Sequence, residues 1–305
     1  MLSAACRQVP RPGILTLDHL AHFAPDVDAA SAALERLGFT LTPFSEQSHR
    51  LREEGPLVSA GTGNRCIMLE RGYLELLTPT GATPNADQLR AAMNRYVGVH
   101  VVVFGTATPE ADHARLAGAG FEPLAPIALQ RPISTPAGEA IARFTVVRVP
   151  AGTMAEGRIQ YCHHHTPELL WQERWIAHPN GATALAAAIL CVEDPEEAAA
   201  RYGRFSGLTW RTERKARHLQ TARGTLVFVD RETAERALGA RAPTMPWIAG
   251  YVLESGNCAA ARAAALDAGA PIHDLAEGRF GVVLPDALGG IIVFQPPGSG
   301  ALHLG

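Results

Sequence analysis

Short apolar runs of strand length alternate with helix-like segments along this chain, and the first quarter shows the pattern most clearly. Residues 14–23 form one such run. A helix follows, which Asp26 can cap at its start and Gly38 can end. After this helix we expect three strands, at residues 39–44, 65–70 and 73–77, with a polar loop at 45–63. The order is therefore strand, helix, then three strands.

The same order of elements recurs in three later stretches, at a spacing of roughly 75 residues. The four expected modules cover residues 14–79, 97–166, 182–230 and 246–296. The first three helices end in similar pairs, Gly38-Phe39, Gly120-Phe121 and Gly207-Leu208. A single module would expose one apolar sheet face, so modules must pair. We predict an α+β fold of four βαβββ modules, paired into two open β-barrel-like domains at 14–170 and 182–297. The alternative is an α+β protein without a repeat.

Composition and charge exclude several classes of protein. The 305 residues are 47% hydrophobic and 19% charged, with a formal net charge of −3. This charge indicates no nucleic-acid partner, and no apolar run reaches the roughly 20 residues that a membrane helix needs. Residues 1–13 lack the apolar core of a signal peptide, so we expect a cytoplasmic protein. The five cysteines are scattered and form no Cys-x-x-Cys motif, which favours reduced thiols.

Two strands of the first module each carry one side chain that can bind a metal ion. His19 lies in the run Leu17-Asp18-His19-Leu20, and Glu75 lies in Gly72-Tyr73-Leu74-Glu75-Leu76. Imidazole nitrogens and carboxylate oxygens are common ligands of divalent metals. Each residue also has a simpler interpretation. His19 would then be a core histidine, and Glu75 a strand charge that faces solvent.

Several segments together resemble one protein family. They are Leu17-Asp18-His19-Leu20, His49, Gly61-Thr62-Gly63-Asn64, Gly72-Tyr73-Leu74-Glu75-Leu76, residues 160–168 and His178-Pro179-Asn180-Gly181-Ala182. With the paired modules, these segments resemble the glyoxalase-like domain family of the vicinal oxygen chelate superfamily. That superfamily includes glyoxalase I, extradiol dioxygenases, methylmalonyl-CoA epimerase and antibiotic-resistance binders. The resemblance implies a barrel that holds one divalent metal ion (Zn, Ni, Mn or Fe), with ligands from the first and last strands of each module. Such an ion binds two neighbouring substrate oxygens as a Lewis acid.

The resemblance places ligands unequally in the two modules of the first half. In module one, His19 and Glu75 match the expected positions, and Glu75 is also a candidate for catalytic proton transfer. In module two the matching positions are Val101, whose side chain has no ligand atom, and Gln160, which is a poor ligand compared with glutamate. The remaining candidate ligands are two histidines of that module. These are His100, which needs a one-residue slip of its strand, and His164 of the triplet His163-His164-His165.

Three residues of the first module are candidates for contacting the substrate. His49 lies in the expected polar loop, which can fold over the barrel, and it can be either a metal ligand or a substrate contact. Asn64 follows a Gly-rich turn, and Arg65 can pair with a substrate carboxylate. The alternative for all three is an ordinary surface or turn position.

Modules three and four lack the expected ligands. The positions that match His19 fall within 186–188 and 248–250, which contain only Ala, Ile and Gly, and the last strands carry no acid. We therefore expect the second half to be structural, to form a homodimer, or to provide a wall of the first pocket.

The sequence thus predicts a divalent-metal-dependent enzyme that acts on a small molecule with adjacent oxygens, by lyase, isomerase, hydrolase or dioxygenase chemistry. The main alternative is a metal-free protein of the bleomycin-resistance type that binds or sequesters a small molecule. Trp171 and Trp175 can help to line its cavity. A third hypothesis is a non-catalytic dimerisation module.

Overall fold

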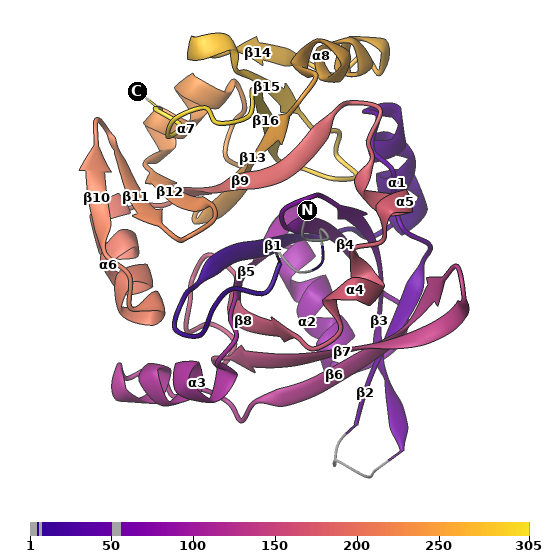
Figure 1. Cartoon of the computed structure of the whole chain (residues 1–305). Helices are drawn as coiled ribbons and strands as arrows, with labels where there is room; N and C mark the ends of the chain where they lie inside the picture. The colour runs from indigo at the N-terminus through magenta and orange to yellow at the C-terminus, as the bar shows by residue number, and fades with distance from the viewer. Residues whose placement is uncertain (1–4, 6–7, 51–55, 305) are drawn as a thin grey trace.

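Sixteen strands of the described residues form one continuous sheet, with helices packed around it (Figure 1). The structure is a computed structural model, which describes residue 5 and residues 8–50 and 56–304, apart from the side chains of residues 49, 50 and 57. The predicted α+β fold class is confirmed.

The first half of the sheet closes into an eight-stranded barrel. The order around the barrel is β1-β4-β3-β2-β6-β7-β8-β5, and β5 pairs again with β1. Module one provides β1 (Thr16–Phe23), α1 (Val27–Arg36), β2 (Ser45–Arg50), β3 (Leu57–Met68), β4 (Tyr73–Pro79) and α2 (Pro84–Met93). Module two provides β5 (Gly98–Gly105), α3 (Pro109–Gly118), β6 (Ile127–Thr135), β7 (Gly138–Arg148) and β8 (Arg158–His164). The barrel closes where β2 pairs with β6, at two residue pairs.

The second half of the sheet stays open, with β10 and β14 at its two edges. Two short helices, α4 (Pro167–Leu170) and α5 (Glu173–Ile176), connect the halves. The next elements are β9 (Ala182–Cys191), α6 (Pro195–Ser206), β10 (Trp210–Glu213), β11 (Ala216–Gln220), β12 (Thr225–Val229) and α7 (Arg231–Leu238). The last are β13 (Trp247–Ser255), α8 (Cys258–Asp267), β14 (Ile272–Asp274), η2 (Ala276–Gly278), β15 (Phe280–Val283) and β16 (Ile291–Gln295).

The predicted strand at residues 39–44 and the predicted loop at 45–63 are corrected by the structure. Residues 39–44 lie outside any strand, and the polar segment Ser45–Arg50 is β2, which pairs with β3. This hairpin extends away from the rest of the barrel (Figure 1). None of the described side chains of β2 is buried, and no apolar alternation marks this strand in the sequence.

Local signals fix the helix that follows β1. The Asp26 side chain accepts hydrogen bonds from the backbone N–H groups of Asp28 and Ala29 and so caps α1. Gly38 has φ of +80°, a conformation that suits glycine after a helix end. All eight residues of β1 are buried, because the strand lies between β4 and β5.

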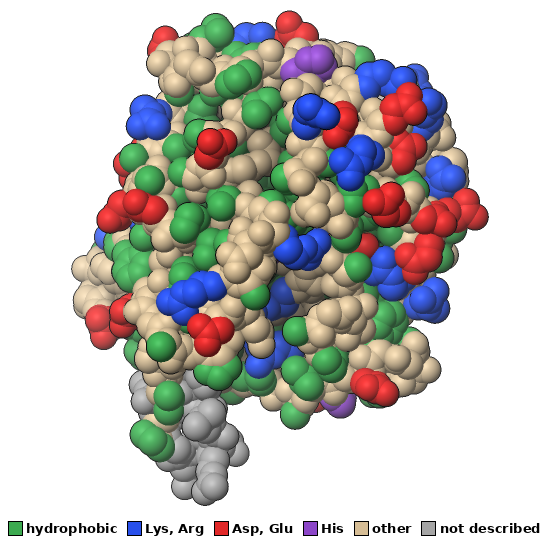
Figure 2. Space-filling view, turned by 180° about the vertical axis from the view of Figure 1, so that it is seen from behind, with side chains coloured by type: hydrophobic (Ala, Val, Ile, Leu, Met, Phe, Trp, Pro, Cys, Tyr) green, Lys and Arg blue, Asp and Glu red, His purple; other side chains and the backbone are tan. Residues whose placement is uncertain are grey.

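Positive and negative side chains are interspersed on the face shown in Figure 2. None of the helices formed by the described residues has the length and apolar character needed to cross a membrane.

Candidate metal centre

An irregularity in β1 brings two neighbouring side chains, Asp18 and His19, together. The pairing of β1 with β5 shifts register between Leu17 and His19. The shift interrupts the alternation that would otherwise send Asp18 and His19 to opposite faces of the sheet. Nδ1 of His19 consequently lies 2.6 Å from Oδ2 of Asp18.

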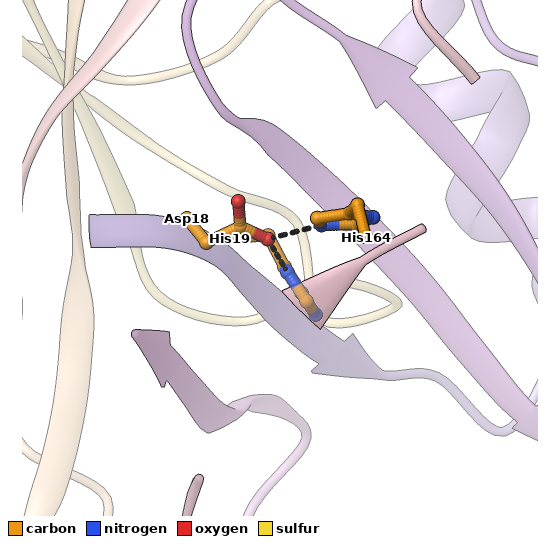
Figure 3. Close-up of side chains that lie close together, drawn as sticks. All are labelled: Asp18, His19 and His164. Carbon is orange, nitrogen blue, oxygen red and sulfur yellow. Dashed lines mark hydrogen bonds and ion pairs between the residues drawn. The ribbon is translucent and has the colours of Figure 1, made fainter. Parts of the chain in front are cut away.

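His164 completes a cluster of three side chains (Figure 3). It is the last residue of β8, and its Nε2 lies 2.9 Å from the same Oδ2 atom of Asp18. Asp18, His19 and His164 are 0%, 5% and 3% exposed. Within the part of the chain that the structure describes, no other three His, Cys, Asp or Glu residues bring potential metal ligands so close together.

Asp18 and His164 form a buried ion pair. Burial tends to raise the pKa of Asp18, but His164 and His19 together hold it far below its usual range. Burial tends to lower the pKa of His164, yet Cys162 and Asp18 raise it to about 10. Because burial raises the pKa of the Cys162 thiol, this group is neutral near pH 7. The Asp18 carboxylate is therefore the charge that keeps His164 protonated.

The chemistry of this donor set fits a divalent metal ion. Two imidazole nitrogens and one carboxylate oxygen form a ligand set suited to iron and related metals. Oδ1 of Asp18 accepts no hydrogen bond from the described residues, although Nη2 of Arg223 lies 3.8 Å away. An ion at this place would displace the protons that join the histidines to Asp18, so its binding would compete with protonation of His164.

Aromatic rings close the cluster off from water. The Tyr73 ring stacks on His19 with centroids 4.1 Å apart, and its hydroxyl oxygen lies 3.2 Å from Nε2 of His19. Trp171, at the end of α4, packs edge-on against His164 with centroids 5.1 Å apart, and Phe144 packs against it from β7. Burial raises the pKa of Tyr73 well above its usual value, so its hydroxyl group stays neutral.

Glu75 lies in a neighbouring polar network rather than in this cluster. Its Oε1 atom accepts hydrogen bonds from Asn64 and from Gln47, the latter at 3.1 Å. The Asn64 amide oxygen accepts a hydrogen bond of 2.8 Å from Arg131. The structure thus brings the candidates His19 and His164 together, and it joins Glu75 to Asn64.

Two other candidate residues, His100 and Arg65, lie apart from both groups. Nε2 of His100 lies 2.8 Å from the backbone oxygen of Tyr96, and the His100 ring stacks on Tyr96. Arg65 donates to the backbone oxygen of Thr42 at 3.0 Å and forms an ion pair with Glu35. His49 lies in β2, but its side chain falls outside the described part of the chain.

Two residues that sequence reasoning missed are Asp18 and Arg131. Simple alternation along β1 places Asp18 opposite His19, and the bulge that changes this depends on pairing with β5. The sequence signal that could have identified Asp18 is its position next to His19 in a run of apolar residues. Arg131 precedes Pro132 in a strand of mixed polarity, and nothing in that local pattern indicates burial.

A family model described as a glyoxalase-like domain matches residues 17–206, more than half of the chain. The chain belongs to the glyoxalase-like domain family. The matched range includes all three residues of the cluster, and the resemblance found in the sequence is confirmed. No curated protein matches this chain.

Solved structures of low sequence identity share the fold of this glyoxalase-like chain. A hypothetical protein from Staphylococcus aureus has a TM-score of 0.59 at 11% identity, over 93% of this chain and 100% of that chain. A Mn(II)-bound glyoxalase from Novosphingobium aromaticivorans has a TM-score of 0.54 at 10% identity, over 92% and 81%. A catechol 2,3-dioxygenase has a TM-score of 0.52 at 12% identity, over 95% and 92%. These likenesses show the vicinal oxygen chelate fold.

Proposed function

We propose that this protein is a metal-dependent enzyme whose divalent ion is bound by Asp18, His19 and His164. The observation that carries the proposal is one buried carboxylate oxygen held between two histidine nitrogens. Buried charged groups are costly unless they are paired or bind a metal. The fold supports the proposal, since a Mn(II)-bound glyoxalase shares it.

The substrate class in this proposal is a small molecule with two adjacent oxygens. The bound ion (zinc, nickel, manganese or iron) would supply Lewis-acid polarisation of those oxygens. Tyr73 orients the His19 ring through stacking and through its hydroxyl group. Glu75, fixed by Asn64 and Gln47, is the proposed acceptor of a substrate proton. Lyase, isomerase and dioxygenase chemistry all fit this arrangement.

A second candidate function is metal-free binding of a small molecule. The observation that favours it is a cavity of about 240 Å³ at the end of the barrel, which Trp175 helps to line. Trp171 instead packs on His164, between α4 and the cluster. A binding protein would use the cavity and leave the cluster as a structural ion pair.

Elemental analysis separates the two functions. Protein purified without a metal-affinity tag is incubated with Zn²⁺, Ni²⁺, Mn²⁺ or Fe²⁺, desalted and analysed for bound metal. We expect about one equivalent in the wild type, loss of it in His164→Gln, and retention in His163→Gln. The second variant is a matched control, because His163 is the neighbouring histidine and lies outside the cluster. A wild type without stoichiometric metal, or His164→Gln with full occupancy, contradicts the metal site.

Glu75→Gln tests the separate role of Glu75. Because the glutamine oxygen can still accept the bonds from Asn64 and Gln47, the fold should persist. If Glu75 transfers protons, this variant keeps its metal. Loss of the metal would make Glu75 a ligand.

A further inference from the structure

The cavity at the end of the barrel has mainly apolar walls and one cationic residue. It has a volume of about 240 Å³ and lies among β2, β6 and the segment of α4 and α5. The apolar side chains that matter for its shape are Phe44, Met68, Ile133, Leu169, Leu170 and Trp175. Arg131 belongs to the same lining and is only 8% exposed. An apolar ligand body with one negative group suits such a site.

Arg131 is fixed in place but lacks a direct acidic partner. It donates to Oδ1 of Asn64 at 2.8 Å and to Sγ of Cys66 at 3.7 Å. Burial raises the pKa of the Cys66 thiol to about 11, so this contact provides no negative charge near pH 7. No Asp or Glu of the described residues forms an ion pair with Arg131, and the Asn64 amide separates it from Glu75. Two contacts leave further N–H groups of the guanidinium available.

The barrel-facing side of β7 and β8 carries two more arginines, Arg148 and Arg158. Alternation places Arg158 on the side of Cys162 and His164, and Arg148 lies two residues from Val146 of the barrel core. Arg158 donates to neutral oxygens of α2, and neither arginine forms an ion pair within the described residues. Burial and the nearby Arg148 lower the pKa of Arg158 to about 10, which leaves it protonated near pH 7. Neither arginine lines the cavity, and the Glu75 carboxylate opposes part of their charge, so they raise the positive potential of the barrel interior without contacting a ligand in the cavity.

We propose that this cavity binds a small carboxylate with an apolar body and that Arg131 binds the carboxylate group. One guanidinium matches the single charge of a carboxylate, with two parallel hydrogen bonds. Glu46 and Glu139 line the cavity too, but both are exposed and screened by water. The proposal deepens the proposed function, since the carboxylate would be its substrate, but binding itself requires no metal.

The position of the cavity relates the ligand to the cluster. The Arg131 guanidinium carbon lies 5.9 Å from the centroid of the Phe144 ring, and that ring lies 5.3 Å from the His164 ring. A carboxylate on Arg131 is therefore held one aromatic ring away from His164.

Calorimetric titration of EDTA-dialysed protein tests the proposal with benzoate and with benzamide, its neutral analogue. We expect saturable benzoate binding, tighter than benzamide binding by about tenfold or more. Arg131→Met should abolish this preference, whereas Arg131→Lys should keep part of it. Arg143→Met is the matched control, because Arg143 is an exposed arginine of β7 that does not line the cavity. It should retain the full preference.

A filled cavity provides an independent test should Arg131→Met fail to fold. Leu169→Trp places a larger apolar side chain in the cavity without changing any charge, and it should abolish benzoate binding. The proposal is overturned by absent benzoate binding, by equal affinity for benzamide, by an undiminished preference in Arg131→Met, or by benzoate binding in Leu169→Trp. The titrations use protein from which EDTA has removed any metal. If the protein has no metal site, the proposed enzyme function is therefore wrong, but the expected preference for benzoate over benzamide stays the same.

Discussion

The inner faces of the two halves of the sheet use equivalent strand positions for opposite kinds of side chain. Strands β1, β9 and β13 each pair with one parallel neighbour, and the first paired residue of each strand gives a common reference position. This residue is His19 in β1, Ala187 in β9 and Gly250 in β13. The positions that match Glu75 are both valines, on β12 and β16. The first half thus presents imidazole and carboxylate groups where the second half presents small and apolar ones.

The second half covers part of its inner face with its own chain. Helix α7 and the C-terminal residues Leu302 and Leu304 pack against Val227 and Val293 in one buried cluster. The first half instead covers one end of its barrel with Trp171 and leaves a cavity beside it. A face filled by the chain needs only apolar packing, whereas a face that binds a ligand must also bury polar groups. The contrast is one of degree, because the second half also has a cavity of about 240 Å³, beside Val227 and Val252, and charged residues such as Glu254 and Arg223 help to line it.

Removing the central charge of the first inner face should have the largest effect. In Asp18→Asn, His164 loses the carboxylate that raises its pKa, while the shape of the side chain is kept. Breaking a buried ion pair on one side costs about 3–5 kcal/mol, so the free energy of unfolding should fall by that amount. Urea denaturation measures it, and the variant should also bind no metal.

The matched control is Asp112→Asn, which alters a buried carboxylate paired with Arg115 on the outer helix α3. It should leave metal binding unchanged. Equal stability of Asp18→Asn and the wild type would show that the cluster holds no ion pair.

Opening the second inner face should have the next largest effect. Leu302 and Leu304 are 5% and 1% exposed, and the double change to alanine removes both from the cluster under the open sheet. Large-to-small changes in a core typically cost 2–5 kcal/mol each. Because the chain end can rearrange, we expect the free energy of unfolding to fall by about 2–4 kcal/mol in total. The variant should also bind a hydrophobic dye that the wild type does not bind.

Leu266→Ala provides the control. Because Leu266 is 63% exposed, this variant should be almost as stable as the wild type. If the double variant unfolds like the wild type, the tail does not stabilise the second half.

The fold was predictable from the sequence because its signals are local. The cap at Asp26, the glycine at Gly38 and the apolar runs that become β1 and β4 each depend on a few neighbouring residues. Strand β2 was not predictable in this way, since its residues are polar and its pairing partners lie on β3 and β6. Closure of the barrel depends on that strand.

The candidate site was only partly predictable, for a related reason. His19 and His164 stand out as histidines at strand positions that match a known pattern. Asp18 joins them through a bulge, and that bulge exists only because β1 pairs with β5. Arg131 reaches Asn64 only when β6 and β3 lie on either side of β2 in the closed barrel. Both contacts are set by tertiary structure, which a local pattern does not encode.

Acid should weaken the contact between the two halves. His22 of β1 lies 3.1 Å from the Tyr251 hydroxyl oxygen and 3.1 Å from the Leu288 backbone oxygen, both in the second half. Burial lowers its pKa from 6.5 to about 4. Between these two pH values His22 binds a proton in the unfolded chain but not in the folded chain. The contribution of neutral His22 to the free energy of unfolding is therefore complete above pH 6.5 and is lost as the pH falls towards 4. The loss should be roughly 2–3 kcal/mol.

Urea denaturation between pH 7 and pH 4.5 measures this loss, with His22→Gln as the comparison. The variant should show a shallower pH dependence. Part of the dependence should remain, because burial also lowers the pKa of His100 to about 4. Identical slopes for the two proteins would assign the acid sensitivity to other groups.

The smallest predicted effect concerns a residue of the second half that reaches the cluster of the first. The turn between β11 and β12 docks on β1, where the Leu17 N–H donates to the Arg223 backbone oxygen at 2.7 Å. Nη2 of Arg223 lies 3.8 Å from Oδ1 of Asp18. Arg223→Met keeps the backbone contact and removes the charge. We expect about 1 kcal/mol or less of lost stability and about tenfold weaker metal binding in a chelator competition.

Arg211→Met is the control for Arg223→Met, because Arg211 lies in the same half and pairs with Glu213 rather than with Asp18. If both variants bind metal as the wild type does, the second half serves the first only as a scaffold. If Arg223→Met alone binds metal more weakly, the second half positions Asp18. The second half, which lacks metal ligands of its own, would then contribute to the site through the side chain of Arg223.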